Sequence, residues 1–439
     1  MNIQKNGINL LLVAEALLLV VVLVLGVVSG ATGMMKNLTG DTEDNKVSIS
    51  TENNGNSSET DNGSESQNPN DTSNGGTENT GYVIPEDYTE GRVTFSDSVE
   101  AKLASMTVEQ KVAQLFLVTP EELTGYNKVT AFGNASKEAL NRYPVGGFVY
   151  TANSFQNAAQ TQSLLKLAKA YSLSEFGMTL FTAVEEEGGE QYSPLANALG
   201  HNRGSLASEI GAQGSASAVE QATQSRVNYV KADEFNLLLS TVADVSSALD
   251  TGYRLRTFGT DALMVSQLVD ADIRTIEKSG VYSTLKYFPG KANASANGSG
   301  VLTSNETLEE LSKGSLLAFQ SGIDAGATFV MIGNVIVPSI TDDENVPCCL
   351  SNRTVGLLRQ EMGFEGIIIT DNFSEAGFVS VYGNGTACVE AIKAGVDMIY
   401  MPSDFAEAYN AVLEAVNNGN ISADRLNNAV GRILTEKGV

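Results

Sequence analysis

Gly366-Ile-Ile-Ile-Thr-Asp371-Asn-Phe373 is a run of apolar residues that ends in a carboxylate. An unbroken apolar run of this length, with no alternation of polar residues, is typical of a strand that is buried on both faces of a parallel sheet. In parallel α/β folds the functional side chains lie at the carboxyl ends of the strands. Asp371 occupies such an end, so the run predicts both a parallel sheet and a candidate site residue.

Similar runs recur along the chain, with amphipathic stretches between them. The predicted strands are Gln114–Thr119, Gly147–Tyr150, Leu180–Glu185, Asn236–Val242, Tyr282–Tyr287, Thr328–Ile332, Gly366–Thr370 and Asp397–Met401. The predicted helices include Ala158–Tyr171, Ala262–Lys278, Glu306–Ser321 and Cys388–Ala394. This many β/α units in about 345 residues favours a (β/α)8, TIM-like barrel. The alternative, an open Rossmann-like sheet, is disfavoured because no Gly-x-Gly-x-x-Gly follows any of these strands.

The N-terminal part of the chain predicts export. Residues 10–28 are almost wholly apolar, interrupted by Glu15, and this is close to the ~20 residues that a membrane-spanning helix needs. We therefore expect a transmembrane anchor within residues 1–35, with the N-terminus inside because Lys5 precedes the run. The alternative is a signal peptide cleaved after Ser29-Gly30-Ala31. The first reading gives a single-pass cell-membrane protein with an extracellular barrel, and the second gives a secreted one.

Residues 36–92 form an acidic stretch rich in Asn, Ser, Thr and Gly. Such a segment buries too little apolar surface to offset the entropy lost on ordering, so we expect a disordered linker. The remaining residues, 93–439, are expected to form a single barrel domain.

Composition limits the partners and cofactors. A net charge of −25 argues against nucleic acid, because phosphate binding needs a basic face. The cysteines, Cys348, Cys349 and Cys388, give no disulfide framework, although a bridge from one of the adjacent pair to Cys388 stays open. His201 is the only histidine and no Cys-x-x-Cys is present, so we expect no metal site and no cofactor.

From Met106 almost to the C-terminus the chain carries an ordered set of motifs. They are Met106-Thr-Val-Glu-Gln-Lys, Pro144-Val-Gly-Gly-Phe-Val, Val184-Glu-Glu-Glu-Gly-Gly189, Leu255-Arg-Thr-Phe-Gly259, Lys286-Tyr-Phe-Pro-Gly290, Ile369-Thr-Asp371 and Ile421-Ser-Ala-Asp-Arg-Leu. Together they resemble glycoside hydrolase family 3, in its single-domain β-N-acetylhexosaminidase branch, where the third to sixth motifs read D-Q-E-G-G, G-x-R-S-F-G, K-H-F-P-G and V-T-D. The resemblance implies a TIM-like barrel that hydrolyses N-acetylglucosaminides in carbohydrate or cell-wall glycan.

The resemblance also implies roles for particular residues. Asp371 takes the position of the nucleophile, which in a retaining glycosidase attacks the anomeric carbon. Glu185, Arg256, Lys286 and Tyr287 take substrate-binding positions. From the residues alone, Asp371 can instead cap the following helix, and the two cations can instead pair with carboxylates of an acidic mouth.

One loop departs from the family pattern, which runs K-H-F-P-G-H-G-D-T-x-x-D-S-H from Lys286. The proton donor of this branch is the last histidine, oriented by the aspartate two residues before it. Aligned without gaps, these positions become Ser299 and Asn297, while the earlier histidines become Tyr287 and Lys291. A serine hydroxyl is too weak an acid to protonate a leaving alkoxide, and losing the donor is expected to cost about 10²–10⁴ in rate.

Other positions change as well. Glu190 stands where the family has an arginine, and Asn334 stands where it has a further histidine. Crowding can raise the pKa of a carboxyl into the range of a proton donor, and the candidates are Glu186, Glu187, Glu190 and Glu375. His201 is expected to be an exposed loop residue rather than a substitute acid.

Two functions are compatible with the sequence. The first is an extracellular, membrane-tethered glycoside hydrolase of the β-N-acetylhexosaminidase type, acting on N-acetylglucosamine-containing glycan. The second is a catalytically inactive, membrane-tethered barrel that binds glycan or a protein partner. Asp371 favours the first function, and the loss of the proton donor favours the second.

Overall fold

The computed structural model describes residues 81–247 and 253–439, all of which belong to a compact unit that begins at Gly76. The expected anchor and most of the expected linker lie outside these residues. The strands of the main sheet are β1 (Phe116–Val118), β2 (Gly147–Val149), β3 (Phe181–Val184), β4 (Leu237–Val242), β5 (Tyr282–Phe288), β8 (Phe329–Ile332), β10 (Ile367–Thr370) and β11 (Ile399–Tyr400). Each lies within a predicted run or ends one residue beyond it. All eight predicted strands are therefore confirmed.

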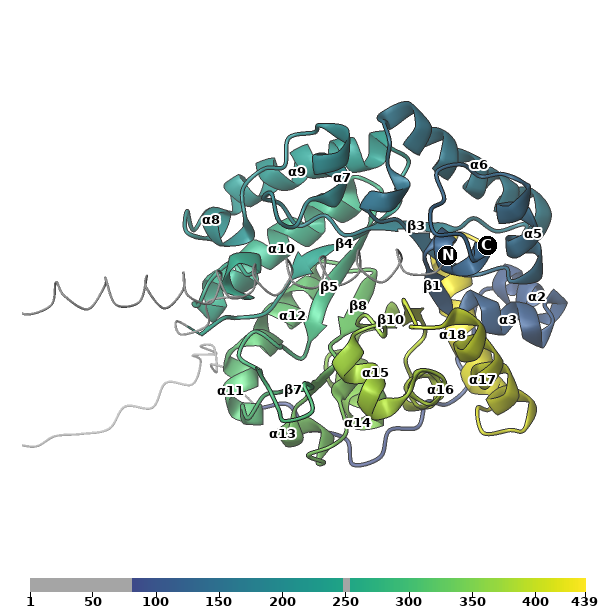
Figure 1. The fold of residues 1–439 in the computed structure, drawn as a ribbon. Helices are drawn as coiled ribbons and strands as arrows, with labels where there is room; N and C mark the ends of the chain where they lie inside the picture. The colour runs from purple at the N-terminus through teal and green to yellow at the C-terminus, as the bar shows by residue number, and fades with distance from the viewer. Residues whose placement is uncertain (1–80, 248–252) are drawn as a thin grey trace, which may run out of the picture. The chain divides into compact units, whose positions relative to one another are not determined.

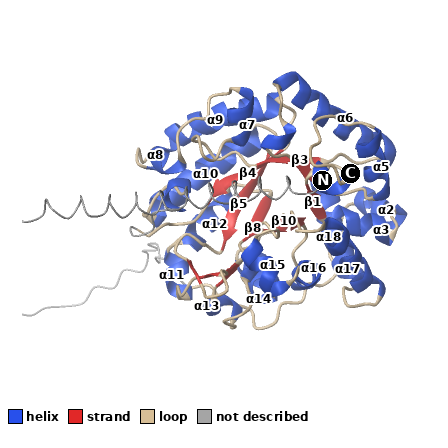
Figure 2. Cartoon of the chain, in the orientation of Figure 1, coloured by secondary structure: helices blue, strands red, loops and turns tan. Residues whose placement is uncertain are grey.

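Within the described chain the eight strands are parallel and lie side by side in the order β10-β8-β5-β4-β3-β2-β1-β11. The two ends of this order meet through a parallel bridge between Ile369 and Met398, where the Thr370 N–H donates to the Met398 carbonyl at 3.0 Å. The ring is thus nearly closed, with strands at the centre and helices around them (Figure 1, Figure 2). The predicted TIM-like barrel is confirmed, and the open sheet is wrong.

The helices fill the connections between the strands. The longer ones are α5 (Asn134–Arg142), α6 (Ala158–Phe176), α9 (Ala216–Ala232), α10 (Ala262–Lys278), α12 (Ser315–Asp324), α16 (Asn384–Ala394), α17 (Phe405–Asn417) and α18 (Ala423–Glu436), with α2 (Asp97–Ser105) and α3 (Val108–Gln114) before β1. The shorter ones are α4 (Pro120–Thr124), α7 (Pro194–Leu199), α8 (Ala207–Gly211), α11 (Leu308–Lys313), α13 (Pro338–Thr341), α14 (Asn352–Gly356) and α15 (Ala376–Tyr382), with helical turns η1 (Ala152–Ser154), η2 (Tyr253–Arg256), η3 (Cys348–Leu350) and η4 (Leu357–Glu361).

One of the predicted helices is divided into two in the structure. The stretch Glu306–Ser321 contains α11 and the greater part of α12, because Gly314 leaves the helical region at φ −113° and ψ −117°. Glycine adopts such a conformation at little cost. The break lets the Ser315 hydroxyl oxygen accept the Val245 N–H at 3.0 Å, which fixes the loop after β4 to the start of α12.

A second, small sheet lies in the connections that follow β5 and β8. It consists of β6 (Ser295–Ala296), β7 (Leu302–Thr303) and β9 (Val335–Ile336), with β6 and β7 antiparallel. The loop in which the family carries its proton donor is therefore folded as a short hairpin.

The folded unit begins earlier than residue 93, where the sequence analysis placed its start. Residues 81–92 lie against the base of the barrel, which we define as the N-terminal ends of its strands. Tyr88 is 9% exposed, and it packs on Gly356, where an added Cβ would come within 2.8 Å of the Tyr88 Cβ. Apolar and charged side chains in this part of the segment find partners on the barrel, so composition alone placed the end of the linker too late.

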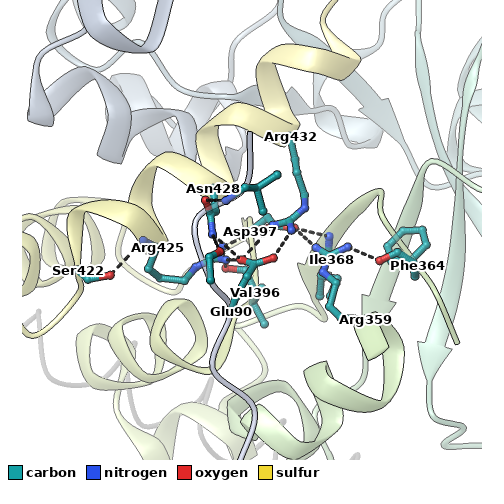
Figure 3. A network of polar contacts seen from close by, with 12 residues as sticks. Glu90, Arg359, Phe364, Ile368, Val396, Asp397, Ser422, Arg425, Asn428 and Arg432 are labelled. Atoms are coloured by element: carbon teal, nitrogen blue, oxygen red, sulfur yellow. Dashed lines mark hydrogen bonds and ion pairs between the residues drawn. The ribbon is translucent and has the colours of Figure 1, made fainter. Parts of the chain in front are cut away.

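The best-defined of these partners form the basal cluster, made of Glu90, Arg359, Asp397, Arg425 and Arg432 (Figure 3). Asp397 precedes β11 and accepts from Arg359 at 2.6 Å, Arg425 at 2.7 Å and Arg432 at 3.1 Å. Glu90 accepts from Arg425 at 2.6 Å and also pairs with Arg432. Burial opposes the charge of Asp397, but the three guanidinium groups outweigh it and hold the pKa of Asp397 below its usual range.

The described residues also bear on the expected membrane helix, on a disulfide and on a metal site. No helix in residues 81–247 and 253–439 is both long and apolar enough to cross a membrane. Cys348, Cys349 and Cys388 are buried free thiols, so the bridge that the sequence left open is not formed. The same residues contain no group of His, Cys, Asp and Glu side chains suited to a metal ion.

Candidate active site

The barrel mouth, which we define as the carboxyl ends of the strands, contains Asp371 directly after β10. Asp371 is 3% exposed. Its Oδ1 accepts the Asn372 N–H at 2.8 Å, and its Oδ2 lies 2.5 Å from Lys291 Nζ. The next helix, α15, begins only at Ala376 with Glu375 at its N-cap. The reading of Asp371 as a helix cap is therefore wrong, and its carboxylate belongs to the mouth.

Lys291 is the cation at this carboxylate, and the loop after β5 brings it there. Gly290 turns the chain with φ at +129°, and an added Cβ would lie 2.8 Å from the Ser315 hydroxyl oxygen, so the turn requires glycine. Lys291 Nζ also lies 3.7 Å from the centroid of the Tyr287 ring. The ammonium is thus held between a carboxylate and an aromatic face. From the sequence, Lys291 stood out only as a position where the family has a histidine, and its pairing with Asp371 was not predicted.

A second charged group lies beside the first. Glu187 accepts from Arg256 at 2.7 and 2.6 Å and pairs with Lys286 Nζ at 2.6 Å. Burial opposes ionisation of Glu187, but Lys286 and Arg256 outweigh it and hold the pKa of Glu187 below its usual value. Arg256 also donates to the Tyr287 hydroxyl at 2.6 Å. The two cations therefore pair with a carboxylate, as one of the two alternatives predicted.

Asp244 supports the loop that carries these residues. It follows β4, is fully buried, and accepts the Lys291 N–H at 2.9 Å and the Tyr287 N–H at 3.3 Å. Burial raises the pKa of Asp244 to about 7, although the backbone donors favour its charged form. Asp244 was not predicted from the sequence, although its position two residues beyond a predicted strand end was an available signal.

The remaining carboxylates at the third strand end differ in their surroundings. Glu185 is half-buried and accepts the Tyr400 hydroxyl at 3.2 Å. Glu186 is buried and accepts the first N–H groups of α7, from Leu195 at 2.9 Å and Ala196 at 3.3 Å. Burial raises the pKa of Glu186 despite these donors. The Glu186 carboxyl group thus caps the N-terminus of α7.

Glu190, the charge reversal relative to the family, does not enter the mouth. Its side chain is 82% exposed and pairs with Arg203 at 3.1 Å. The altered charge therefore lies on the outer surface, where a solvated ion pair contributes little to stability.

Ser299 and Asn297 occupy the hairpin between β6 and β7, and both are exposed. The Ser299 hydroxyl donates to Asn297 Oδ1 at 2.6 Å, and the same oxygen accepts the N–H groups of Ser299 and Val301 at 3.0 Å each. Asn293, from the same loop, donates to the Val245 carbonyl at 3.2 Å. Amide and hydroxyl groups thus stabilise the turn, and neither group is an acid in the working range of a glycosidase.

His201 was expected to be exposed, and this is wrong. Its side chain is 26% exposed, its Nε2 lies 2.6 Å from Asp233 Oδ2, and its ring stacks on Tyr229 at 4.7 Å. A buried acceptor and an aromatic face hold the imidazole, so it is a structural residue beside α9.

Comparisons with known proteins agree with this geometry. The family model described as "Glycosyl hydrolase family 3 N terminal domain" matches residues 107–436, so the chain belongs to glycoside hydrolase family 3. A "Beta-N-acetylglucosaminidase/beta-glucosidase" of Cellulomonas fimi is 26% identical over 77% of this chain and 59% of that protein. "Beta-hexosaminidase A" of Pseudoalteromonas piscicida is 26% identical over 79% of this chain and 64% of that protein. The chain thus spans less than two thirds of each.

Solved structures give the same result. A family 3 β-N-acetylglucosaminidase from Paenibacillus sp. str. FPU-7 aligns with a TM-score of 0.70 at 26% identity, over 76% of this chain and 62% of that one. A β-N-acetylhexosaminidase from Beutenbergia cavernae aligns with a TM-score of 0.67 at 28% identity, over 76% of this chain and all of that one. The chain is therefore a member of the hexosaminidase branch of the family.

Proposed function

We propose that this protein is a retaining glycoside hydrolase directed at β-N-acetylhexosaminides, with Asp371 as its nucleophile. The observation that carries the proposal is the position of Asp371, buried at the end of β10 with its carboxylate in the barrel mouth. The relatives named as β-hexosaminidases support the choice of an N-acetylglucosamine-containing glycan as substrate. No cofactor is required for this chemistry.

In this proposal each charged group of the mouth has one task. Asp371 forms a bond to the anomeric carbon, and the bond to the leaving oxygen breaks. Arg256, already fixed by Glu187, is 17% exposed and offers its remaining donors to sugar hydroxyls. Lys286 is fully buried between Glu187 and the Leu239 carbonyl, so it positions Glu187 and supports the sugar site from below its surface. Glu185 accepts from a hydroxyl. These groups are pre-positioned by the fold, so binding costs little side-chain ordering.

A specific observation favours a second candidate, a barrel that binds glycan or a protein partner without hydrolysing it. Lys291 Nζ lies 2.5 Å from the nucleophile oxygen, and a paired carboxylate is a weaker nucleophile than a free one. Ser299 stands at the position of the family's proton donor and Asn297 at that of the orienting aspartate, and the two bond to each other. In this second candidate, the groups at the mouth still bind a sugar, but the protein does not hydrolyse it.

A glycoside with an activated leaving group separates the two candidates, because 2,4-dinitrophenolate departs without protonation. We expect the full chain to hydrolyse the dinitrophenyl β-glycoside of N-acetylglucosamine, and Asp371→Asn to lower the rate by about 10³-fold or more. Asp424→Asn, on the exposed start of α18, is the matched control and should retain the wild-type rate. If the wild type is inert yet binds chitooligosaccharides in calorimetry, the non-hydrolytic candidate replaces the first.

We also propose that the barrel acts outside the cell, tethered to the membrane by residues 1–35. The support is the apolar run 10–28 and the polar stretch after it. Protease added to intact cells that express the full chain should degrade the barrel. Protection of the barrel in intact cells, with degradation only after lysis, would contradict the proposed location.

A further inference from the structure

Most carboxylates around the barrel mouth are already committed to other contacts. Glu187 lies against two cations, Glu186 accepts from the start of α7, and Asp244 accepts backbone N–H groups. Glu190 is turned to solvent. The first three cannot exchange a proton with a sugar above Asp371 without losing contacts that hold the fold. Glu190 is excluded by its position, because its side chain points away from the mouth.

Glu375 differs from all of them in position. It lies four residues after Asp371, immediately before α15, and is open to solvent. Asn334 Nδ2 donates to Glu375 Oε2 at 3.3 Å and to the Asn372 carbonyl at 2.8 Å. The Cys349 thiol donates to Asn334 Oδ1 at 3.4 Å. The Asn334 amide, whose oxygen accepts the Cys349 thiol, thus links the Glu375 carboxyl to the segment that carries Asp371.

The electrostatic surroundings suit a proton donor. Partial burial raises the pKa of Glu375, the Asp371 carboxylate raises it further, and Glu185 acts in the same direction. Lys291 and the Asn334 amide oppose this shift but do not cancel it. Cys349, which donates to the same Asn334, is a neutral thiol because burial raises its pKa. A carboxyl with a raised pKa near a nucleophilic carboxylate is the pairing that retaining hydrolysis uses.

We propose that Glu375 is the acid/base of this site, in place of the histidine that the family carries in the loop after β5. The inference rests on the proposed function. In the first step Asp371 bonds to the anomeric carbon, the bond to the leaving oxygen breaks, and Glu375 gives its proton to that oxygen. In the second step water attacks the anomeric carbon, Glu375 takes the proton of that water, and the bond to Asp371 breaks. Glu375 regains its proton, so the cycle balances.

The test compares two substrates in Glu375→Gln, with Glu190→Gln as the matched exposed control. For N,N′-diacetylchitobiose, whose leaving oxygen needs a proton, we expect kcat/KM to fall by about 10²–10⁴-fold. For the dinitrophenyl glycoside we expect a fall of less than about tenfold, because that leaving group needs no proton. The alkaline limb of the pH profile of kcat/KM should disappear, since it reports the donor. Glu190→Gln should match the wild type on both substrates.

Azide supplies an independent readout, because it is a nucleophile that needs no base. In Glu375→Ala, added azide should speed turnover of the dinitrophenyl glycoside and give the glycosyl azide of retained configuration. Equal losses on both substrates, or no loss on either, would overturn the assignment of Glu375. If Asp371→Asn is inactive while Glu375→Gln behaves as wild type, only this inference fails. If the wild type is inert, or Asp371→Asn keeps its turnover, the proposed function fails and this inference with it.

Discussion

The base and the mouth of the barrel both hold carboxylates among cations, but they hold them differently. In the basal cluster every side chain is between 0% and 10% exposed, and two carboxylates share three guanidinium groups (Figure 3). At the mouth, Glu185 and Glu375 remain accessible beside the buried Asp371–Lys291 pair. A buried charge network is therefore no sign of a site in this protein. The carboxylates that solvent can still reach distinguish the candidate site at the mouth from the basal cluster.

The largest expected effect is at the base. Asp397→Asn leaves the three guanidinium groups of the basal cluster with one carboxylate instead of two, and breaking a buried charge network in this way costs about 3–5 kcal/mol. Chemical denaturation should show this as a lower midpoint, while Asp424→Asn should change the free energy of unfolding by less than about 0.5 kcal/mol. A change at Asp397 as small as at the control would mean that the basal cluster contributes little to the stability of the barrel and of residues 81–92, which reach the cluster through Glu90.

The next effect depends on pH and concerns Asp244. Its folded pKa is about 7 and its unfolded pKa is about 3.9, so between these values the folded state binds more protons than the unfolded state. The free energy of unfolding should therefore fall as pH rises from about 4 to 7, by up to about 4 kcal/mol, and level off above. Asp244→Asn should remove this slope in denaturant titrations at several pH values. An unchanged slope would contradict the buried, protonated carboxyl.

A smaller loss is expected at the mouth. Lys291→Met leaves the Asp371 carboxylate without its cation, but only one ion pair is broken here and the carboxylate keeps the Asn372 N–H as a donor. We therefore expect a loss of about 1–3 kcal/mol in the free energy of unfolding, less than for Asp397→Asn. Lys278→Met, on the exposed end of α10, serves as control. A loss equal to that at the base would show that the mouth is as closed to solvent as the basal cluster.

The smallest effect is expected in the hairpin between β6 and β7. Ser299→Ala removes one exposed hydroxyl that bonds to Asn297, so activity toward the dinitrophenyl glycoside and its pH profile should stay within about twofold of wild type. Steady-state kinetics over a pH series measures both. A loss of 10²-fold or more on this substitution would restore the proton-transfer role to the loop.

The fold could be predicted from the sequence because its strands are buried on both faces. Runs such as Gly366–Thr370 have no polar alternation, and that pattern identifies them whatever surrounds them. The break at Gly314 and the early start of the folded unit were missed for a different reason. Both depend on contacts with distant residues, such as Ser315 with Val245 and Glu90 with Arg425, and no local pattern records such partners.

Part of the candidate site could be proposed from the sequence for the same reason, and its role stays a prediction. A strand end located Asp371, and motifs located Arg256 and Lys286. Which carboxylate each cation pairs with, however, is decided in three dimensions. Lys291 meets Asp371 across 80 positions of sequence, and Glu187 draws both Arg256 and Lys286. His201 was misjudged because a loop position says nothing of Asp233 and Tyr229, which hold it.

The most direct test of the account is to trap the covalent intermediate. A 5-fluoro analogue of an N-acetylglucosaminyl fluoride forms the glycosyl–enzyme readily, because fluoride departs without a proton, and the ring fluorine then slows hydrolysis. Intact-mass spectrometry of the full chain should show the addition of one glycosyl group, and peptide mapping should place it on Asp371, with none in Asp371→Asn. An unlabelled wild type, or a label on another residue, would contradict Asp371 as the nucleophile.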